Sequence, residues 1–181
     1  MPPLVERALA LAAELGFAKS CSPEAGRLLH LLAAQRGRER VGEIGTGAGV
    51  GAAWLASALA PGVSLWTAEA DPELARGAAG LFADDPDVHV LAGSWREVLP
   101  EHAPFDLLFY DGGGKQRPDL DGDQAVALLA PGGLALLDDL TPGLPGPDPV
   151  REFWLDHPLL HAVELLTSHE SAAILAVRRS S

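Results

Sequence analysis

From Arg40 onward, short apolar runs alternate with segments of helical periodicity, and this alternation constrains the fold more than any other feature of the sequence. Strands separated by helices form parallel sheets with helices on their faces, because a parallel connection has to cross over the sheet. Such crossovers are right-handed by default. Seven runs are predicted as strands, at residues 40–44, 63–68, 88–91, 105–110, 134–137, 161–166 and 172–177.

Helices are predicted near the N-terminus and between the first five strands. Ser22 followed by Pro23 is a typical helix start, because a serine side chain caps free N–H groups and proline fits the first helical position. The predicted helices cover residues 4–15, 23 to about 37, 50–59, 72–82, 94–99 and 120–129.

The connection between the last two predicted strands is too short for a crossover. Only residues 167–171 separate them, whereas a parallel crossover needs about a dozen residues or more. The pair should therefore form an antiparallel hairpin, which places a reversed strand in an otherwise parallel sheet. The predicted fold class is α/β.

Length and composition limit the functions that remain. A chain of 181 residues with 48% hydrophobic residues is expected to form one domain, residues 1–181, with a sizeable core. A net charge of -12 has the wrong sign for neutralising phosphates, so nucleic acid is not an expected partner. The single cysteine, Cys21, and the lack of a signal peptide or a long apolar run predict a cytoplasmic protein with no membrane partner.

A glycine-rich turn joins the first predicted strand to the next helix. Its glycines allow a backbone to approach a ligand closely, although a tight turn without a ligand would use the same residues. Glu69 ends the second predicted strand, where an acidic side chain can bind ribose hydroxyls or simply lie in solvent. The turn reads Gly45-Thr46-Gly47-Ala48-Gly49-Val50-Gly51 and follows Glu43.

Two ligands compete for this turn, a nicotinamide dinucleotide and S-adenosylmethionine. A dinucleotide places its pyrophosphate on the helix N-terminus, where Glu43 would repel it. S-adenosylmethionine carries a sulfonium and an ammonium group, which a carboxylate attracts. The turn therefore favours S-adenosylmethionine, with an NAD(P)-dependent oxidoreductase as the alternative.

Four motifs, in this order, carry a family resemblance. They are Glu-Ile-Gly-Thr-Gly at 43–47, Glu-Ala-Asp-Pro-Glu at 69–73, Phe-Asp-Leu-Leu-Phe-Tyr-Asp at 105–111, and Pro-Gly-Gly-Leu at 131–134, which leads to Asp138 and Asp139. Together they resemble the class I S-adenosylmethionine-dependent O-methyltransferases of the catechol and caffeoyl-CoA type. The resemblance implies a Rossmann-like, seven-stranded, mostly parallel sheet with a reversed last strand and helices on both faces.

The resemblance also implies which residues bind the cofactor. Trp95 would either stack on the adenine or fill the core. The implied contacts are Glu43, Gly45, Thr46, Gly47, Gly49 and Gly51 around the methionine part, Glu69 and Ala70 at the ribose, Gly93, Ser94 and Trp95 at the adenine, and Asp111 after the fourth strand.

By the same resemblance, Asp111, Asp138 and Asp139 would hold Mg²⁺ or another divalent cation, and Lys115 and Asp111 would be catalytic, with Lys115 as the general base. The chain departs from the family pattern here. Three glycines separate Asp111 from Lys115, one residue more than usual, which leaves Lys115 flexible and open to a role as a solvated loop residue. Asp139 replaces an asparagine and is an alternative main ligand.

The function implied is transfer of a methyl group to a hydroxyl oxygen of a small-molecule acceptor, with a divalent cation as optional assistance. Residues 1–39 and the proline-rich loop at 141–149 are expected to form the lid of the site, and a homodimer is a further expectation. A non-catalytic module that binds S-adenosylmethionine is the alternative from another class.

Overall fold

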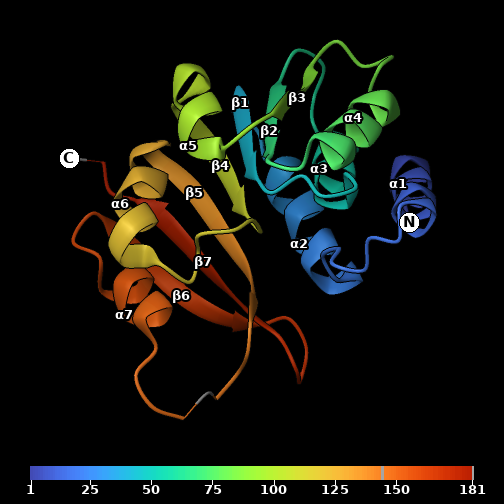
Figure 1. Ribbon diagram of the computed structural model, residues 1–181. Coiled ribbons are helices and arrows are strands. Elements are labelled where there is room, and N and C mark those ends of the chain that lie inside the picture. The colour runs from blue at the N-terminus through green and yellow to red at the C-terminus, as the bar shows by residue number, and fades with distance from the viewer. Residues whose placement is uncertain (144, 181) are drawn as a thin grey trace.

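A mixed β-sheet runs through the molecule, with helices on both of its faces (Figure 1). The computed structural model describes residues 1–143 and 145–180. Within them the sheet has seven strands in the order β3-β2-β1-β4-β5-β7-β6. The strands are β1 Arg40–Ile44, β2 Ser64–Glu69, β3 Val88–Ala92, β4 Phe105–Tyr110, β5 Leu129–Leu140, β6 Leu160–Leu166 and β7 Ala172–Arg178.

Strand β7 alone runs against the others in this described sheet. Strands β1 to β5 pair in parallel, and β7 pairs antiparallel with both β5 and β6. Backbone hydrogen bonds from Thr167 and Ser168 to the carbonyl of Ser171, both 3.0 Å long, close the β6–β7 hairpin. The predicted sheet with a reversed last strand is confirmed.

The helices divide between the two faces of the sheet. In Figure 1, α1 to α4 lie on one side of the sheet and α5 to α7 on the other. They are α1 Pro3–Glu14, α2 Pro23–Ala33, α3 Val50–Ala56, α4 Pro72–Leu81, α5 Trp95–Val98, α6 Pro118–Ala127 and α7 Pro149–Asp156, with a 3₁₀ turn at Pro100–His102. No helix in the described residues is both long and apolar enough to cross a bilayer.

Side-chain caps fix where several helices begin. The Ser22 hydroxyl accepts a hydrogen bond from the backbone N–H of Ala25, and the Asp71 carboxylate accepts two from the first turn of α4. Asp148 caps α7 in the same way. Each cap is followed by proline, which needs no hydrogen-bond partner for its nitrogen and has the backbone angle of a helix.

Two apolar layers form the core, one under each set of helices. Leu29 and Leu55 are among the buried residues of the α1–α4 layer, and Trp154 and Tyr110 of the α5–α7 layer. The central strand β4 contributes to both layers, since Phe109 faces the first and Tyr110 the second. Because β1 and β4 lie at the centre of the sheet, their carboxyl ends are rigid platforms for the residues that follow.

Several elements differ from the sequence prediction. Strand β5 begins at Leu129, which was predicted as the last residue of a helix, because Leu129 pairs with Phe105 of β4. Helix α3 ends at Ala56 rather than at residue 59. Helix α7 was not predicted, although Asp148 before Pro149 is the same starting signal as Ser22 before Pro23.

Candidate functional site

A cavity of about 650 Å³ opens at the carboxyl ends of β1, β2 and β4. This is the edge at which open α/β sheets bind their ligands. Most of the predicted site residues line it: Glu43, Gly45, Thr46, Gly47, Gly51, Glu69, Ala70, Gly93, Ser94, Trp95, Asp111, Lys115 and Asp139. The predicted residues Gly49 and Asp138 are not among the residues that line the cavity.

The glycine turn between β1 and α3 is packed against its neighbours. Gly45 has a φ of +94°, and a side-chain carbon there would lie 2.5 Å from the Cα of Gly112. A side-chain carbon at Gly47 would lie 2.6 Å from the ring of Phe17. At Gly49 it would meet Leu81 of α4, at 3.3 Å, so Gly49 serves the packing of the turn and not the cavity wall.

Glu43 is fully buried beneath the turn. Its Oε2 accepts a hydrogen bond of 2.5 Å from the hydroxyl of Thr67, which in turn pairs with the Thr46 hydroxyl. Its Oε1 is buried and has no partner among the described residues. Burial raises the pKa of Glu43 to about 8, against the lowering effect of the Thr67 hydrogen bond. A cationic ligand group in the cavity would supply the partner that Oε1 lacks.

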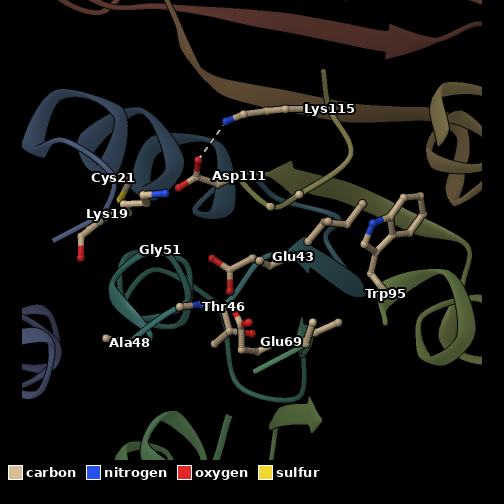
Figure 2. A pocket seen from close by; sticks show the side chains of 18 of the residues that line it. Lys19, Cys21, Glu43, Thr46, Ala48, Gly51, Glu69, Trp95, Asp111 and Lys115 are labelled. Atoms are coloured by element: carbon tan, nitrogen blue, oxygen red, sulfur yellow. Dashed lines mark hydrogen bonds and ion pairs between the residues drawn. The ribbon is translucent and has the colours of Figure 1, made fainter. Parts of the chain in front are cut away.

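Glu69 ties the ends of β1 and β2 together. Its Oε2 accepts a hydrogen bond of 2.8 Å from the backbone N–H of Gly47, and its Oε1 accepts one of 2.9 Å from Asp71. Figure 2 shows Glu69 and Lys115 toward opposite ends of the cavity, with Glu43 between them. The two glutamates therefore lie at different points along the cavity.

Trp95 both lines the cavity and belongs to the core. Its side chain is buried and packs edge-on against Tyr110, with ring centroids 5.8 Å apart. Arg96 lies over the Trp95 ring and forms a two-bond pair with Asp121. The indole nitrogen of Trp95 is buried without a partner among the described residues. Trp95 therefore fills part of the core, and its place in the cavity lining also allows it to stack on an adenine.

Lys115 is held firmly, which differs from the flexible residue expected after three glycines. Its side chain is 5% exposed, and its Nζ donates to Asp111 Oδ1 at 3.1 Å (Figure 2). The same Nζ donates to the Asp138 carbonyl at 2.7 Å. Two of the three glycines of the loop, Gly112 and Gly114, fit tight spaces. A side-chain carbon at Gly112 would lie 2.9 Å from the Ile44 carbonyl, and one at Gly114 would lie 2.6 Å from Asp121.

Burial and charge also shift the carboxyl groups around Lys115. Burial raises the pKa of Asp111 to about 7, although the positive charge of Lys115 pulls it down. Burial likewise raises the pKa of Asp138, whose two carboxylate oxygens have no hydrogen-bond partner among the described residues. These environments favour the neutral acid more than an ordinary surface does.

The three predicted metal ligands do not converge. Asp139 is 64% exposed and sits in an irregular part of β5, with its Oδ2 4.0 Å from Lys115. Asp138 faces Lys115 with its backbone carbonyl. In residues 1–143 and 145–180, no group of three or more His, Cys, Asp or Glu side chains is arranged to hold a metal ion. The ammonium of Lys115 lies between the groups that were expected to bind the cation.

The N-terminal segment after α1 forms one wall of the cavity. The lining residues of this segment are Phe17, Lys19, Ser20 and Cys21, and the lid expected from residues 1–39 stays a prediction. Burial, with the nearby negative charges, raises the pKa of the Cys21 thiol and keeps it protonated. The other expected part of the lid is not seen, since no described residue of the 141–149 loop lines the cavity.

Several lining residues were not singled out from the sequence. They include Phe17, Lys19, Ser20, Arg96 and Gln116. For Arg96 a signal existed, because it directly follows the predicted segment Gly93 to Trp95. The N-terminal residues carry no such motif, and only the folded chain brings them to the glycine turn.

Comparison with known proteins agrees with this arrangement. Residues 43–140 match a family described as a methyltransferase domain. A protein of Mycobacteroides abscessus that is named as an O-methyltransferase is 33% identical to this chain over 152 residues. The match covers 81% of this chain and 70% of that protein. A Mycobacterium avium protein with the same name is 34% identical over 126 residues. That match covers 66% of this chain and 56% of the Mycobacterium avium protein.

Solved structures resemble the whole chain. The O-methyltransferase TomG from Streptomyces achromogenes, solved in complex with S-adenosylmethionine, matches this chain with a TM-score of 0.81 and 25% identity. The match covers 99% of this chain and 91% of the TomG chain. Cofactor-bound Rv0187 from MTB has a TM-score of 0.85 and 26% identity, and the match covers 100% of this chain and 92% of that one. The chain belongs to the methyltransferase family.

Proposed function

We propose that this chain transfers a methyl group from S-adenosylmethionine to a hydroxyl oxygen of a small molecule. The observation that carries the proposal is the buried Oε1 of Glu43, which has no partner in the described part of the chain and lies at the turn where a methyltransferase chain is expected to bind its cofactor. The similarity to TomG, which was solved with S-adenosylmethionine, supports the same ligand here.

The residues present fit this cofactor. The ammonium of its methionine part would satisfy Glu43, and the ribose hydroxyls would donate to Glu69. Gly51 leaves room for the carboxylate of Glu43, because a side-chain carbon there would collide with Glu43 Oε1. Trp95, at the other wall, offers an aromatic surface to the adenine. The carboxylate of Glu69, which accepts a hydrogen bond from the backbone N–H of Gly47 in this turn, would repel a pyrophosphate, which argues against the NAD(P)-dependent alternative.

Bound S-adenosylmethionine supplies an electrophilic methyl group on a positively charged sulfur. The protein has to place an acceptor oxygen in line with that sulfur and to take up the hydroxyl proton as the new O–C bond forms and the S–C bond breaks. Asp111 is the proposed proton acceptor, because it lines the cavity and its pKa of about 7 suits proton exchange near neutral pH.

A divalent cation does not fit the site as it is arranged. Asp138 and Asp139 do not converge on Asp111, and the ammonium of Lys115 lies between them. No step of the proposed reaction is therefore assigned to a cation.

A transfer assay tests the proposal. Purified protein is incubated with S-adenosylmethionine labelled on its methyl group and with a panel of small phenols, catechols and hydroxycinnamoyl esters. Label is expected on oxygen of at least one acceptor, together with one equivalent of the demethylated cofactor. Tight binding of the cofactor with no transfer across the panel would favour the non-catalytic module.

Three further expectations stay predictions. The net charge of -12 argues against nucleic acid as a partner. Size-exclusion chromatography with light scattering would test the homodimer, and cell fractionation would test the cytoplasmic location.

A further inference from the structure

Lys115 brings a positive charge to a place where a divalent cation was expected. Its Nζ lies 3.1 Å from Asp111 Oδ1, 2.7 Å from the Asp138 carbonyl and 4.0 Å from Asp139 Oδ2. An ammonium has three N–H donors, and two of them are used by protein groups among the described residues. Because Lys115 also lines the cavity, the third donor is available to a ligand there.

The loop that carries Lys115 is built to keep it there. Gly112 packs against Gly45 of the cofactor turn, and Gly114 packs against the Arg96–Asp121 pair. Neither contact leaves room for a side chain. The loop from Asp111 to Lys115 is one glycine longer than usual, and its packed path, fixed by the contacts of Gly112 and Gly114, returns the lysine side chain to Asp111.

An ammonium in this position works against a divalent cation in two ways. It repels a second positive charge a few ångströms away. It also occupies Oδ1 of Asp111, a carboxylate oxygen that a cation would need as a ligand. The ammonium of Lys115 thus supplies the positive charge at the place where the cation was expected.

We propose that Lys115 replaces the divalent cation and that its third N–H holds a single acceptor oxygen beside the methyl group. This inference rests on the proposed function and names its substrate class. A cation can bind both oxygens of a vicinal diol, whereas the one free N–H of Lys115 binds one oxygen. The acceptor class is therefore a small molecule with an isolated phenolic hydroxyl, and a neighbouring second hydroxyl is not required.

The reaction balances without a further reactant. The acceptor O–H bond breaks as its proton passes to the carboxylate of Asp111. The oxygen, held by Lys115, forms a bond to the methyl carbon while the S–C bond breaks. The products are a methyl ether, the neutral demethylated cofactor and a proton, which Asp111 returns to solvent.

The first experiment measures the cation requirement of the wild-type protein. Methyl transfer to matched monophenols and catechols is compared in the presence of EDTA and of Mg²⁺, and Mn²⁺ binding is followed by electron paramagnetic resonance. We expect rates equal within about twofold in EDTA and Mg²⁺, and a kcat/KM for monophenols at least equal to that for catechols. A loss of more than about tenfold in EDTA that Mg²⁺ restores, or stoichiometric Mn²⁺ binding, would overturn the inference.

The second experiment uses Lys115→Met, which keeps the length of the side chain and removes its charge. Because the lost group holds the reacting oxygen, kcat should fall by about 100-fold or more, while the Kd for S-adenosylmethionine changes less than about threefold. Lys115→Arg, which keeps a charged donor, should recover part of kcat. A Lys115→Met protein that binds cofactor and retains transfer within about threefold contradicts the inference.

Failure of the proposed function has a different signature. In that case, no acceptor takes up label from wild-type protein with or without a cation. The melting temperature and cofactor affinity of each variant separate a loss of Lys115 chemistry from a loss of folding.

Discussion

Glu43 is an unusual side chain for the middle of a parallel sheet, since a carboxylate without water needs hydrogen bonds or a counter-charge. One oxygen has Thr67 as its partner, and the other has none among the described residues. Burial in this environment raises the pKa of Glu43, and the shift makes the free energy of unfolding depend on pH. Lys115 is the second such side chain, a buried amine whose position depends on glycines.

The free energy of unfolding should respond to the ionisation of Glu43. Folding raises its pKa from about 4.5 to about 8, so the folded protein keeps a proton that the unfolded chain loses between these values. The contribution of Glu43 to stability is therefore present in full below about pH 4.5 and declines toward pH 8, by at most about 1.4 kcal/mol per pH unit. Denaturant unfolding of the ligand-free protein between pH 5 and pH 8 measures it.

Glu43→Gln is the matched control, because glutamine has the same size and does not titrate. The difference in unfolding free energy between wild type and Glu43→Gln should become steadily less favourable to wild type as the pH rises from 5 to 8. A difference that is constant over this range would show that Glu43 ionises in the folded protein as it does in the unfolded chain.

Gly114→Ala should displace Lys115. Gly114 has a φ of +102°, and a side-chain carbon there would lie 2.6 Å from Asp121 Oδ2 and 2.8 Å from Arg96. The expected cost is about 1–3 kcal/mol of unfolding free energy, together with a lower kcat. The control is Gly113→Ala, one residue earlier, where a side-chain carbon meets nothing within 4 Å. Equal effects of the two substitutions on unfolding and kcat would contradict the packed path of this loop.

Helix α7 is held against the sheet by its buried residues and by the ion pairs of one arginine. Arg151 forms ion pairs with Asp148, the cap of α7, and with Glu164 of β6, at 2.8 Å from Glu164 Oε1. It also donates to the carbonyl of Thr141, just beyond β5. The side chain is largely buried, so these charge-assisted hydrogen bonds are shielded from solvent. They join three elements at the far edge of the sheet.

Arg151→Met should therefore lower the free energy of unfolding by about 2 kcal/mol, because it leaves Glu164 and Asp148 without their partner. The matched control is Arg76→Met, since Arg76 pairs with Glu73 on the exposed face of α4, where both side chains are at least 76% exposed. That substitution should change stability by no more than about 0.5 kcal/mol. Urea denaturation of the two variants tests the ranking, and an equal loss for both would contradict it.

Element by element, the sequence predicts well where local signals and tertiary structure agree. The short 167–171 connection predicts the reversed β7, because no crossover fits in it. The start of β5 was misassigned because Leu129 follows a helix directly, and only its pairing with Phe105 makes it a strand residue. Helix α7 is short and follows a proline-rich loop, which hid the cap signal at Asp148.

At the scale of the whole molecule, the sheet order explains which site residues were predictable. Glu43, Glu69 and Asp111 lie at or beyond the ends of neighbouring parallel strands, so their motifs alone bring them to one edge. Lys115 was not predictable in this way. Its position depends on contacts of Gly112 with Gly45 and of Gly114 with the Arg96–Asp121 pair, which are set by packing between segments far apart in the chain.

The N-terminal wall of the cavity is a second feature of the whole molecule. Phe17 reaches the glycine turn because α1 and α2 pack on α3, and no sequence motif encodes this arrangement. The same packing brings Lys19 and Cys21 to the cavity. The methyl donor and its acceptor are therefore expected to share a chamber that closes only when the N-terminal helices are in place.

The most direct test of the account is a calorimetric titration of S-adenosylmethionine and of NAD⁺ into the wild-type protein, Glu69→Gln and Glu73→Gln. We expect S-adenosylmethionine to bind one per chain and NAD⁺ not to bind at the same concentrations. Glu69→Gln should weaken binding about tenfold or more, because it removes a charged acceptor from the cavity, and the exposed Glu73→Gln should bind within about twofold of wild type. No binding of S-adenosylmethionine to folded protein, tighter binding of NAD⁺, or equal affinities of the two variants would contradict it.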